Sequence, residues 1–225
     1  MIHKNKEIYL KNNLPFFNDL SKKELEELIL KSSIEEYKEG TLIHSKNSPC
    51  TGIILVLSGN LRSFMSSNQG KEITLFKLFD LDICILSSSC MYQNLTYDIN
   101  LEAEKDSSVI IIDGEFFKEL SSNNIYIQNF VLNLTQSKLS EIMWVLEQTV
   151  FFNLENRLAN FLINQYYLDD SITINTTHDT IANHLGSSRE VISRILKRFE
   201  HDDLVKLSRG SIKLTNLEKL KLLCK

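Results

Sequence analysis

The chain has 225 residues, of which 43% are hydrophobic, and its formal net charge is −4 at pH 7. This length and apolar content fit two modest domains with separate cores better than one. No uncharged apolar run approaches the roughly 18 residues that span a bilayer, and no apolar core follows the lysines near the N-terminus. We therefore expect a cytoplasmic protein without a membrane span or a secretory signal.

The four cysteines, Cys50, Cys84, Cys90 and Cys224, are irregularly spaced. In a cytoplasmic protein such spacing predicts free thiols and not a disulfide framework.

The N-terminal part predicts helices that flank an antiparallel β-structure. Ser21-Lys22-Lys23-Glu24 fits a capping box that opens a short helix. From Ile34 to Ile112, short β-rich runs alternate with turn residues, which is typical of antiparallel strands. Asp113 is the expected cap of the short helix that follows, which contains Phe116, Phe117 and Leu120.

Residues 124–148 predict one long helix between the two halves. It carries an apolar stripe with spacing of three and four residues, broken by Thr135 and formed by Leu132, Leu139, Ile142 and Leu146. A self-complementary stripe of this kind predicts a parallel homodimer. The alternative is that the stripe packs on the β-structure of its own chain.

The segment from Thr177 to Val205 predicts a helix-turn-helix. Thr177 and Asp179 are helix-starting residues ahead of a short apolar-faced helix. Gly186 ends that helix, because glycine adopts a left-handed conformation at no steric cost. Ser187 and Ser188 can cap a second helix, which is expected to extend from Arg189 to Phe199.

The second helix has the two faces that a recognition helix needs. Its inward residues are Val191, Ile192, Ile195, Leu196 and Phe199, and its outward residues near the N-terminus are Arg189, Glu190, Ser193 and Arg194. After Val205 the pattern predicts a hairpin wing that carries Arg209 and Lys213.

An excess of positive charge is confined to this part of the chain. Residues 186–213 carry 7 Lys and Arg against 4 Asp and Glu, as phosphate contact requires.

These residues resemble those of the Crp/Fnr transcription regulators. The similarity is strongest in Leu185-Gly186-Ser187-Ser188-Arg189-Glu190-Val191-Ile192-Ser193-Arg194-Ile195-Leu196 and extends to Asn156-Arg157-Leu158-Ala159-Asn160-Phe161-Leu162. Lys38-Glu39-Gly40, Leu57-Ser58-Gly59 and Gly70-Lys71-Glu72 resemble the glycine-marked turns of the family's β-roll. The resemblance implies an α+β fold with three parts: an N-terminal antiparallel β-roll (a cupin-like jelly roll) over 1–122, a dimerisation helix over 123–150, and a winged helix-turn-helix over 151–225.

The resemblance also implies which side chains contact DNA. Arg194 matches the family arginine that pairs with a guanine, Glu190 can accept from a cytosine amino group, and Ser193 and Arg189 adjust neighbouring positions. The half-site is expected to contain a TGA-like core. The remaining expected contacts, to the phosphate backbone and at the helix start, are Ser188, Lys197, Arg198, Arg209 and Lys213.

The sequence gives less information about the effector that the β-roll binds than about the DNA contacts. By resemblance, Leu86 occupies the place of the glutamate that binds the ribose of cyclic AMP, and Tyr97-Asp98 replaces an Arg-Ser pair that binds its phosphate. Cyclic AMP is therefore disfavoured. An iron–sulfur cluster of the family type is also disfavoured, because no cysteine precedes Cys50. A haem is left open, with His44 and Met91 as nominal axial ligands.

Cys84 and Cys90, together with Ser87 and Tyr97, are the remaining effector candidates. Two interpretations stay open: a thiol switch that responds to oxidative or nitrosative stress, or small buried residues of the core.

The sequence thus predicts a homodimeric regulator that binds a palindromic operator in double-stranded DNA, with RNA polymerase as a further partner if it activates transcription. The alternative is an effector-binding or redox-sensing module whose winged helix binds another protein. No arrangement of catalytic residues or metal ligands predicts an enzyme.

Overall fold

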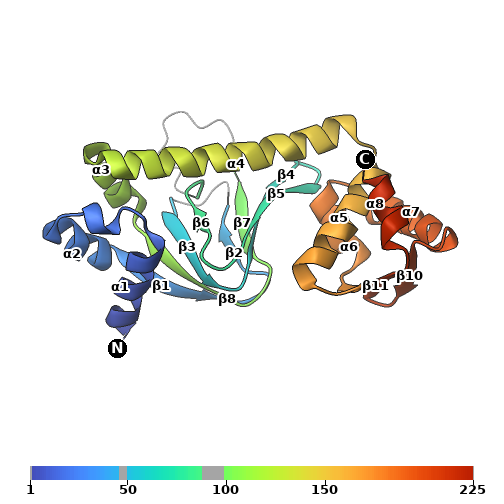
Figure 1. Cartoon of the computed structure of the whole chain (residues 1–225), viewed down its shortest axis with the longest axis horizontal. Helices are drawn as coiled ribbons and strands as arrows, with labels where there is room; N and C mark the ends of the chain where they lie inside the picture. The colour runs from blue at the N-terminus through green and yellow to red at the C-terminus, as the bar shows by residue number, and fades with distance from the viewer. Residues whose placement is uncertain (1, 46–49, 88–98, 225) are drawn as a thin grey trace. The chain divides into compact units, whose positions relative to one another are not determined.

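The computed structural model describes residues 2–45, 50–87 and 99–224 (Figure 1). The chain divides into two compact units. The first consists of residues 1–65 and 75–142, and the second of residues 66–74 and 143–225. No helix in the described ranges is long and apolar enough to cross a membrane.

The N-terminal part of the chain consists of short helices, a run of strands and two further helices (Figure 1). The helices are α1 (Ile2–Asn13), the 3-10 helix η1 (Phe17–Asp19), α2 (Lys22–Leu30), α3 (Gly114–Asn123) and α4 (Ile125–Phe151). The strands are β1 (Ser32–Tyr37), β2 (Leu42–His44), β3 (Ile53–Ser58), β4 (Leu61–Ser66), β5 (Glu72–Leu78), β6 (Ile83–Cys84), β7 (Asn100–Ala103) and β8 (Ser107–Ile112).

These strands form two four-stranded sheets, in the orders β1-β8-β3-β6 and β2-β7-β4-β5. The central strand β3 of the first sheet is buried on both faces. Ile53 and Leu55 belong to a core cluster shared with the short helices, whereas Ile54 and Val56 belong to a cluster shared with the second sheet. This double burial explains why β3 is an uninterrupted apolar run, although an antiparallel strand with one solvated face would alternate. The predicted α+β architecture is confirmed.

The predicted helix starts are also confirmed. Ser21 and Glu24 form the reciprocal capping box of α2, and Asp113 accepts a 2.8 Å hydrogen bond from the backbone N–H of Phe116. The helix α1 is not predicted by the sequence, because the residues around Ile2–Asn13 show neither a capping box nor a strong apolar stripe. It is held instead by distant contacts, since Leu10 is buried in the core and Lys6 donates to the carbonyl of Ser32 at 2.5 Å.

The long helix α4 has a face that packs on the β-roll and an opposite face that is exposed. Ile127 and Leu134 contact the first core cluster, and Lys138 lies over the ring of Phe76 at 4.8 Å. By contrast, Leu132, Leu139 and Leu146 are 62%, 57% and 51% exposed. A single chain therefore leaves three of the four predicted stripe residues without burial.

Ile142, the fourth residue of the predicted stripe, differs from the leucines. It is half-buried and packs against the cluster between the two sheets. At 3.6 residues per turn, Met143 and Val150 continue the line of Leu132 and Leu139, while Ile142 turns toward the β-roll. Met143 and Val150 are exposed to 52% and 62%. The exposed apolar line of α4 therefore contains Met143 and Val150 beside the three leucines.

Leu81, in the turn between β5 and β6, has a backbone conformation that leucine disfavours. Its φ is +70° and its side chain is 52% exposed, so burial does not compensate for the strain. Its N–H donates to the carbonyl of Val56 at 2.8 Å, which fixes the turn. We expect Leu81→Gly to stabilise the protein by about 1 kcal/mol in thermal unfolding. Leu42→Gly, at an exposed strand position, should destabilise it. A lower melting temperature for Leu81→Gly would contradict this explanation.

The second unit is built around a helical core with a small sheet. Its helices are α5 (Leu154–Asp169), α6 (His178–Leu185), α7 (Arg189–His201) and α8 (Leu217–Leu223). Its strands β9 (Thr173–Asn175), β10 (Val205–Ser208) and β11 (Ser211–Leu214) pair in the order β10-β11-β9. The antiparallel pair of β10 and β11 is the predicted wing.

Candidate nucleic-acid interface

The helix-turn-helix is formed by local signals that the structure confirms. Thr177 accepts a 3.1 Å hydrogen bond from the N–H of Thr180 and caps α6. Gly186 ends that helix with φ of +67°. Ser188 caps α7 by accepting from the N–H of Val191 at 3.5 Å. The turn between the two helices is thus fixed by a glycine and two hydroxyl caps.

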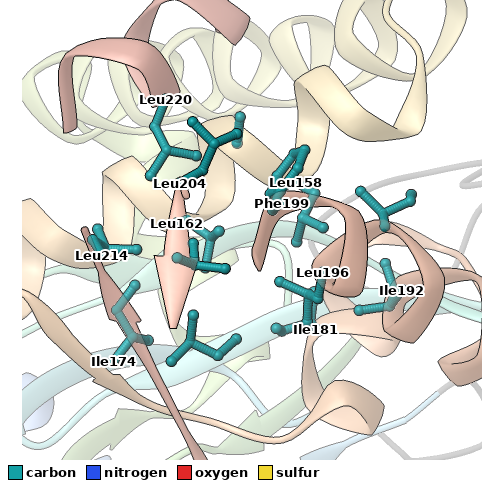
Figure 2. Packing of buried hydrophobic residues seen from close by; sticks show 14 of the residues in the cluster. Leu158, Leu162, Ile174, Ile181, Ile192, Leu196, Phe199, Leu204, Leu214 and Leu220 are labelled. Carbon is teal, nitrogen blue, oxygen red and sulfur yellow. The ribbon is translucent and has the colours of Figure 1, made fainter. Parts of the chain in front are cut away.

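The inward face of α7 is anchored in the core of the second unit. Figure 2 places Ile192, Leu196 and Phe199 of α7 in the same packed cluster as Leu158, Leu162, Ile174, Ile181, Leu204, Leu214 and Leu220. The exposed fractions of the three α7 side chains are at most 2%. Because this face is buried, the orientation of the opposite face is determined by the core.

Arg157 connects α5 to the turn of the helix-turn-helix. Its guanidinium donates to the carbonyl of Leu185 at 2.7 Å, immediately before Gly186. That carbonyl belongs to the last turn of α6, where a cation is favoured by the helix dipole. Burial lowers the pKa of Arg157.

We expect Arg157→Met to lower the free energy of unfolding of the second unit by about 2 kcal/mol, since a hydrogen bond to a charged donor contributes about 1.5–3 kcal/mol. Chemical denaturation measures this change. Arg209→Met, at an exposed position of the wing turn, is the matched control and should leave the stability unchanged. Equal stability of both variants would remove the role assigned to Arg157.

The outward face of α7 contains most of the predicted DNA contacts. Arg189, Glu190, Arg194 and Lys197 are exposed on it. Arg189 forms a 3.0 Å ion pair with Asp179 of α6, and both side chains are more than half exposed. Such an exposed pair contributes little to stability and can be exchanged for a phosphate contact.

Glu190 remains ionised over a wide pH range. Its own backbone N–H, the hydroxyl of Ser188 and the charge of Arg189 lower the pKa of its carboxyl group. An ionised carboxylate has only acceptors, which is the property required to accept a hydrogen bond from a cytosine amino group.

Two predicted contact residues have partners inside the protein. Ser193 is half-buried, and its Oγ lies 2.6 Å from Nδ1 of His178. Arg198 forms an ion pair with Glu155 of α5, because its position on α7 lies at the flank between the buried and outward faces. Like Arg189, Arg198 can bind a phosphate only by exchanging its carboxylate partner, and it stays a predicted contact.

The wing adds exposed cations from a second element. Arg209 lies in the turn between β10 and β11, and Lys213 is exposed on β11. Lys206 lies directly opposite Lys213 in the register and is also exposed. Two like charges in this position repel each other, and an anion between them would relieve that repulsion. Lys206 is not among the contacts predicted from the sequence, although the alternation Val205-Lys206-Leu207 places it on the solvent face.

The effector candidates that the structure describes lie in the core of the β-roll. Cys84 is a free thiol and is 1% exposed; burial raises its pKa, although a backbone hydrogen bond from Ser87 opposes that effect. Ser87 is fully buried, and its hydroxyl donates to the carbonyl of Gly52 at 2.7 Å. A buried, protonated thiol is a poor nucleophile, so Cys84 has the properties of a core residue. Cys90, Met91 and Tyr97 lie outside the described residues.

Two further side chains of the β-roll alter the sequence-based expectations. Cys50 takes part in a disulfide bond, so the prediction that all four cysteines are thiols is wrong for Cys50. His44 is 4% exposed, and its Nδ1 lies 2.8 Å from the hydroxyl of Thr51. Because Nδ1 of His44 is engaged with Thr51, the ring has a structural role in the β-roll. This role weakens the assignment of His44 as a haem ligand.

Comparisons with known proteins cover both units. A model of the Crp-like helix-turn-helix domain matches residues 156–223, and a model of the cyclic nucleotide-binding domain matches residues 34–124. A solved structure of a Crp/Fnr-family regulator from Eubacterium rectale is 39% identical with a TM-score of 0.91, over 95% of this chain and 99% of that chain.

Two curated relatives agree with these matches. The transcriptional activator protein Anr of Pseudomonas aeruginosa is 24% identical over 176 residues, which are 75% of this chain and 70% of the relative. Electron transport regulator A of Shewanella oneidensis is 26% identical over 197 residues, which are 83% of this chain and 76% of the relative. The chain therefore belongs to the Crp/Fnr family of transcription regulators, with a cyclic nucleotide-binding-type domain followed by a Crp-like helix-turn-helix.

Proposed function

We propose that the protein is a homodimeric regulator that binds a palindromic operator through α7 and the wing. The observation that carries this proposal is the outward face of α7, where Arg189, Glu190, Arg194 and Lys197 are exposed while the opposite face is buried. The first turns of α7 enter the major groove. There Arg194 pairs with a guanine and Glu190 accepts from a cytosine.

Phosphate contacts fix the position of this helix on the duplex. We assign them to Lys197 on α7 and to Lys206, Arg209 and Lys213 on the wing. Arg189 joins them by exchanging Asp179 for a phosphate oxygen. The hydroxyl of Ser188 remains the cap of α7 and keeps its first N–H groups oriented toward the DNA.

Dimerisation rests on the exposed apolar line of α4. Leu132, Leu139, Met143, Leu146 and Val150 are each more than half exposed. Monomeric soluble proteins rarely leave a contiguous apolar patch of this kind uncovered. A second copy of α4 is self-complementary to it and supplies the two-fold symmetry of paired half-sites.

Selection of bound sequences from random duplexes, followed by footprinting, tests this proposal. We expect two inverted half-sites with a TGA-like core, protected on the same face of the duplex and separated by one helical turn or a multiple of it. A single half-site, or selection without any consensus, would contradict the dimeric regulator. If the protein activates transcription, RNA polymerase is its further partner.

The signal is proposed to act on the β-roll. Leu86 is 7% exposed and lies in the core between the sheets, at the place where the family resemblance puts a ribose-binding glutamate. Cyclic AMP is therefore not the expected effector. The disulfide at Cys50 favours a redox signal instead, because disulfides in the cytosol of mesophiles are usually catalytic or redox-sensing.

Reduction of that disulfide by dithiothreitol, which converts it to two thiols, should change operator affinity about fivefold or more. Cys50→Ser should abolish the difference between reduced and oxidised protein. Cys224→Ser, which replaces a free thiol in the second unit, is the matched control and should keep the difference. Cys84→Ser, which replaces a free thiol of the β-roll core, should keep it as well. A redox response that survives in Cys50→Ser would place the signal elsewhere.

A further inference from the structure

A side-chain contact connects the two helices of the helix-turn-helix on the side where DNA is expected. His178 is the first residue of α6, next to the cap Thr177. Its Nδ1 lies 2.6 Å from Oγ of Ser193, which precedes Arg194 on α7. The two residues are separated by fifteen positions in the sequence, so the contact depends on the folded turn.

The contact is surrounded by charged groups. Arg189 and Lys197 of α7 face the imidazole of His178, as does Asp179 of α6. Burial lowers the pKa of His178, and the two cations lower it further, while Asp179 opposes them. The imidazole is therefore neutral at pH 7, since its pKa lies below the ordinary value of 6.5.

Protonation of the ring determines what the hydroxyl of Ser193 can offer to a base. In the neutral tautomer that carries its proton on Nε2, Nδ1 accepts, so the hydroxyl of Ser193 donates to it and Oγ presents only lone pairs to the DNA. In the imidazolium both nitrogens carry protons, so Nδ1 must donate. The hydroxyl proton of Ser193 is then free to point toward the base.

We propose that His178 is a positioning residue for sequence recognition, and that its protonation state sets whether Ser193 accepts from or donates to a base edge. This inference rests on the proposed function. With the neutral ring, Ser193 favours an exocyclic amino group, as in adenine or cytosine. With the protonated ring, it favours the acceptors of guanine or thymine.

Operator recognition is therefore expected to depend on pH at one base pair in each half-site. The negative potential of DNA favours the imidazolium, so the bound protein takes up a proton at a higher pH than the free protein. As the pH falls from 8 to 5.5, the preference at that base pair should shift from amino-bearing bases toward guanine or thymine. A single neutral hydrogen bond predicts a change of about two- to tenfold in relative affinity.

The test measures relative affinities for selected operators that differ at single base pairs, at pH 8 and pH 5.5. Ser193→Ala and His178→Leu should lose discrimination at the same base pair, and the double variant should lose no more than either alone. His178→Asn places an amide near the position of Nδ1 and does not titrate. It should restore discrimination at pH 8 without a shift at pH 5.5. Melting temperatures confirm that each variant is folded.

The inference would be overturned if His178→Leu discriminated between bases and responded to pH as the wild type does. The proposal of a DNA-binding regulator would remain intact in that case. Titration of the imidazole by NMR in the free protein separates the two proposals further, because it needs no DNA. Ser193→Ala should move the midpoint of His178, whereas Arg209→Ala at the wing turn should not. An unmoved midpoint in Ser193→Ala would show that the contact is absent in solution and would also overturn the inference.

Discussion

Replacing Arg194 with alanine is expected to weaken operator binding by about 1–3 kcal/mol, which corresponds to roughly a 5- to 150-fold higher Kd. Arg194 is exposed on the outward face of α7, and the buried face behind it fixes its direction. A guanidinium can pair with two acceptors of guanine at once, and no other side chain in this helix has that geometry except Arg189 and Arg198. Arg189 has Asp179 as its partner, and Arg198 has Glu155.

The loss should be confined to one base pair in each half-site. Fluorescence anisotropy with single-substituted operators measures this, because Arg194→Ala should bind all four variants of that base pair about equally. Lys213→Ala is the matched control for charge. It should weaken binding to every sequence alike and reduce the slope of log K against log salt by about 0.9. If Arg194→Ala retained wild-type affinity and preference, the assignment of α7 as the recognition helix would be wrong.

The second large effect is expected at the dimer seam. Leu139 is 57% exposed in the single chain, so Leu139→Glu should leave the protomer folded. In the proposed dimer the substitution buries one carboxylate from each protomer without a partner, and we expect it to cost about 3–5 kcal/mol of dimer stability. Sedimentation equilibrium should therefore detect monomers at concentrations where the wild type is dimeric.

Leu30→Glu provides the control for this experiment. Leu30 is a leucine of α2 with 78% exposure, outside the apolar line of α4, and its replacement should leave the dimer intact. Ile142→Glu is a poor probe, because Ile142 packs against the β-roll core and its replacement would destabilise the protomer itself. An intact dimer in Leu139→Glu would move the interface away from α4.

The sequence predicted best the elements whose signals are local. Thr177, Gly186 and Ser188 act within a few residues of their own positions, and each has the predicted role in the structure. The two faces of α7 follow from helical periodicity in the same way. The resemblance to the Crp/Fnr family added the order of the domains, which local patterns do not specify.

Contacts between distant residues could not be predicted. Arg157 and Leu185 are 28 positions apart, and Arg198 and Glu155 come from different helices. Nothing in the local pattern distinguishes such a cation from one that is free to bind DNA. The half-burial of Ile142 on α4 could not be predicted for a related reason, because spacing alone does not tell which flank of a helix meets the β-roll.

Affinity for the operator and for random duplex, measured side by side over a salt series, tests whether α7 and the wing recognise a specific DNA sequence. A specific regulator predicts an operator affinity at least about 1,000-fold above that of random DNA at physiological salt. The affinity for both kinds of DNA should fall with salt, since phosphate contacts contribute to each. Equal affinities for operator and random duplex across the salt series would contradict the account and favour a winged helix that binds another protein.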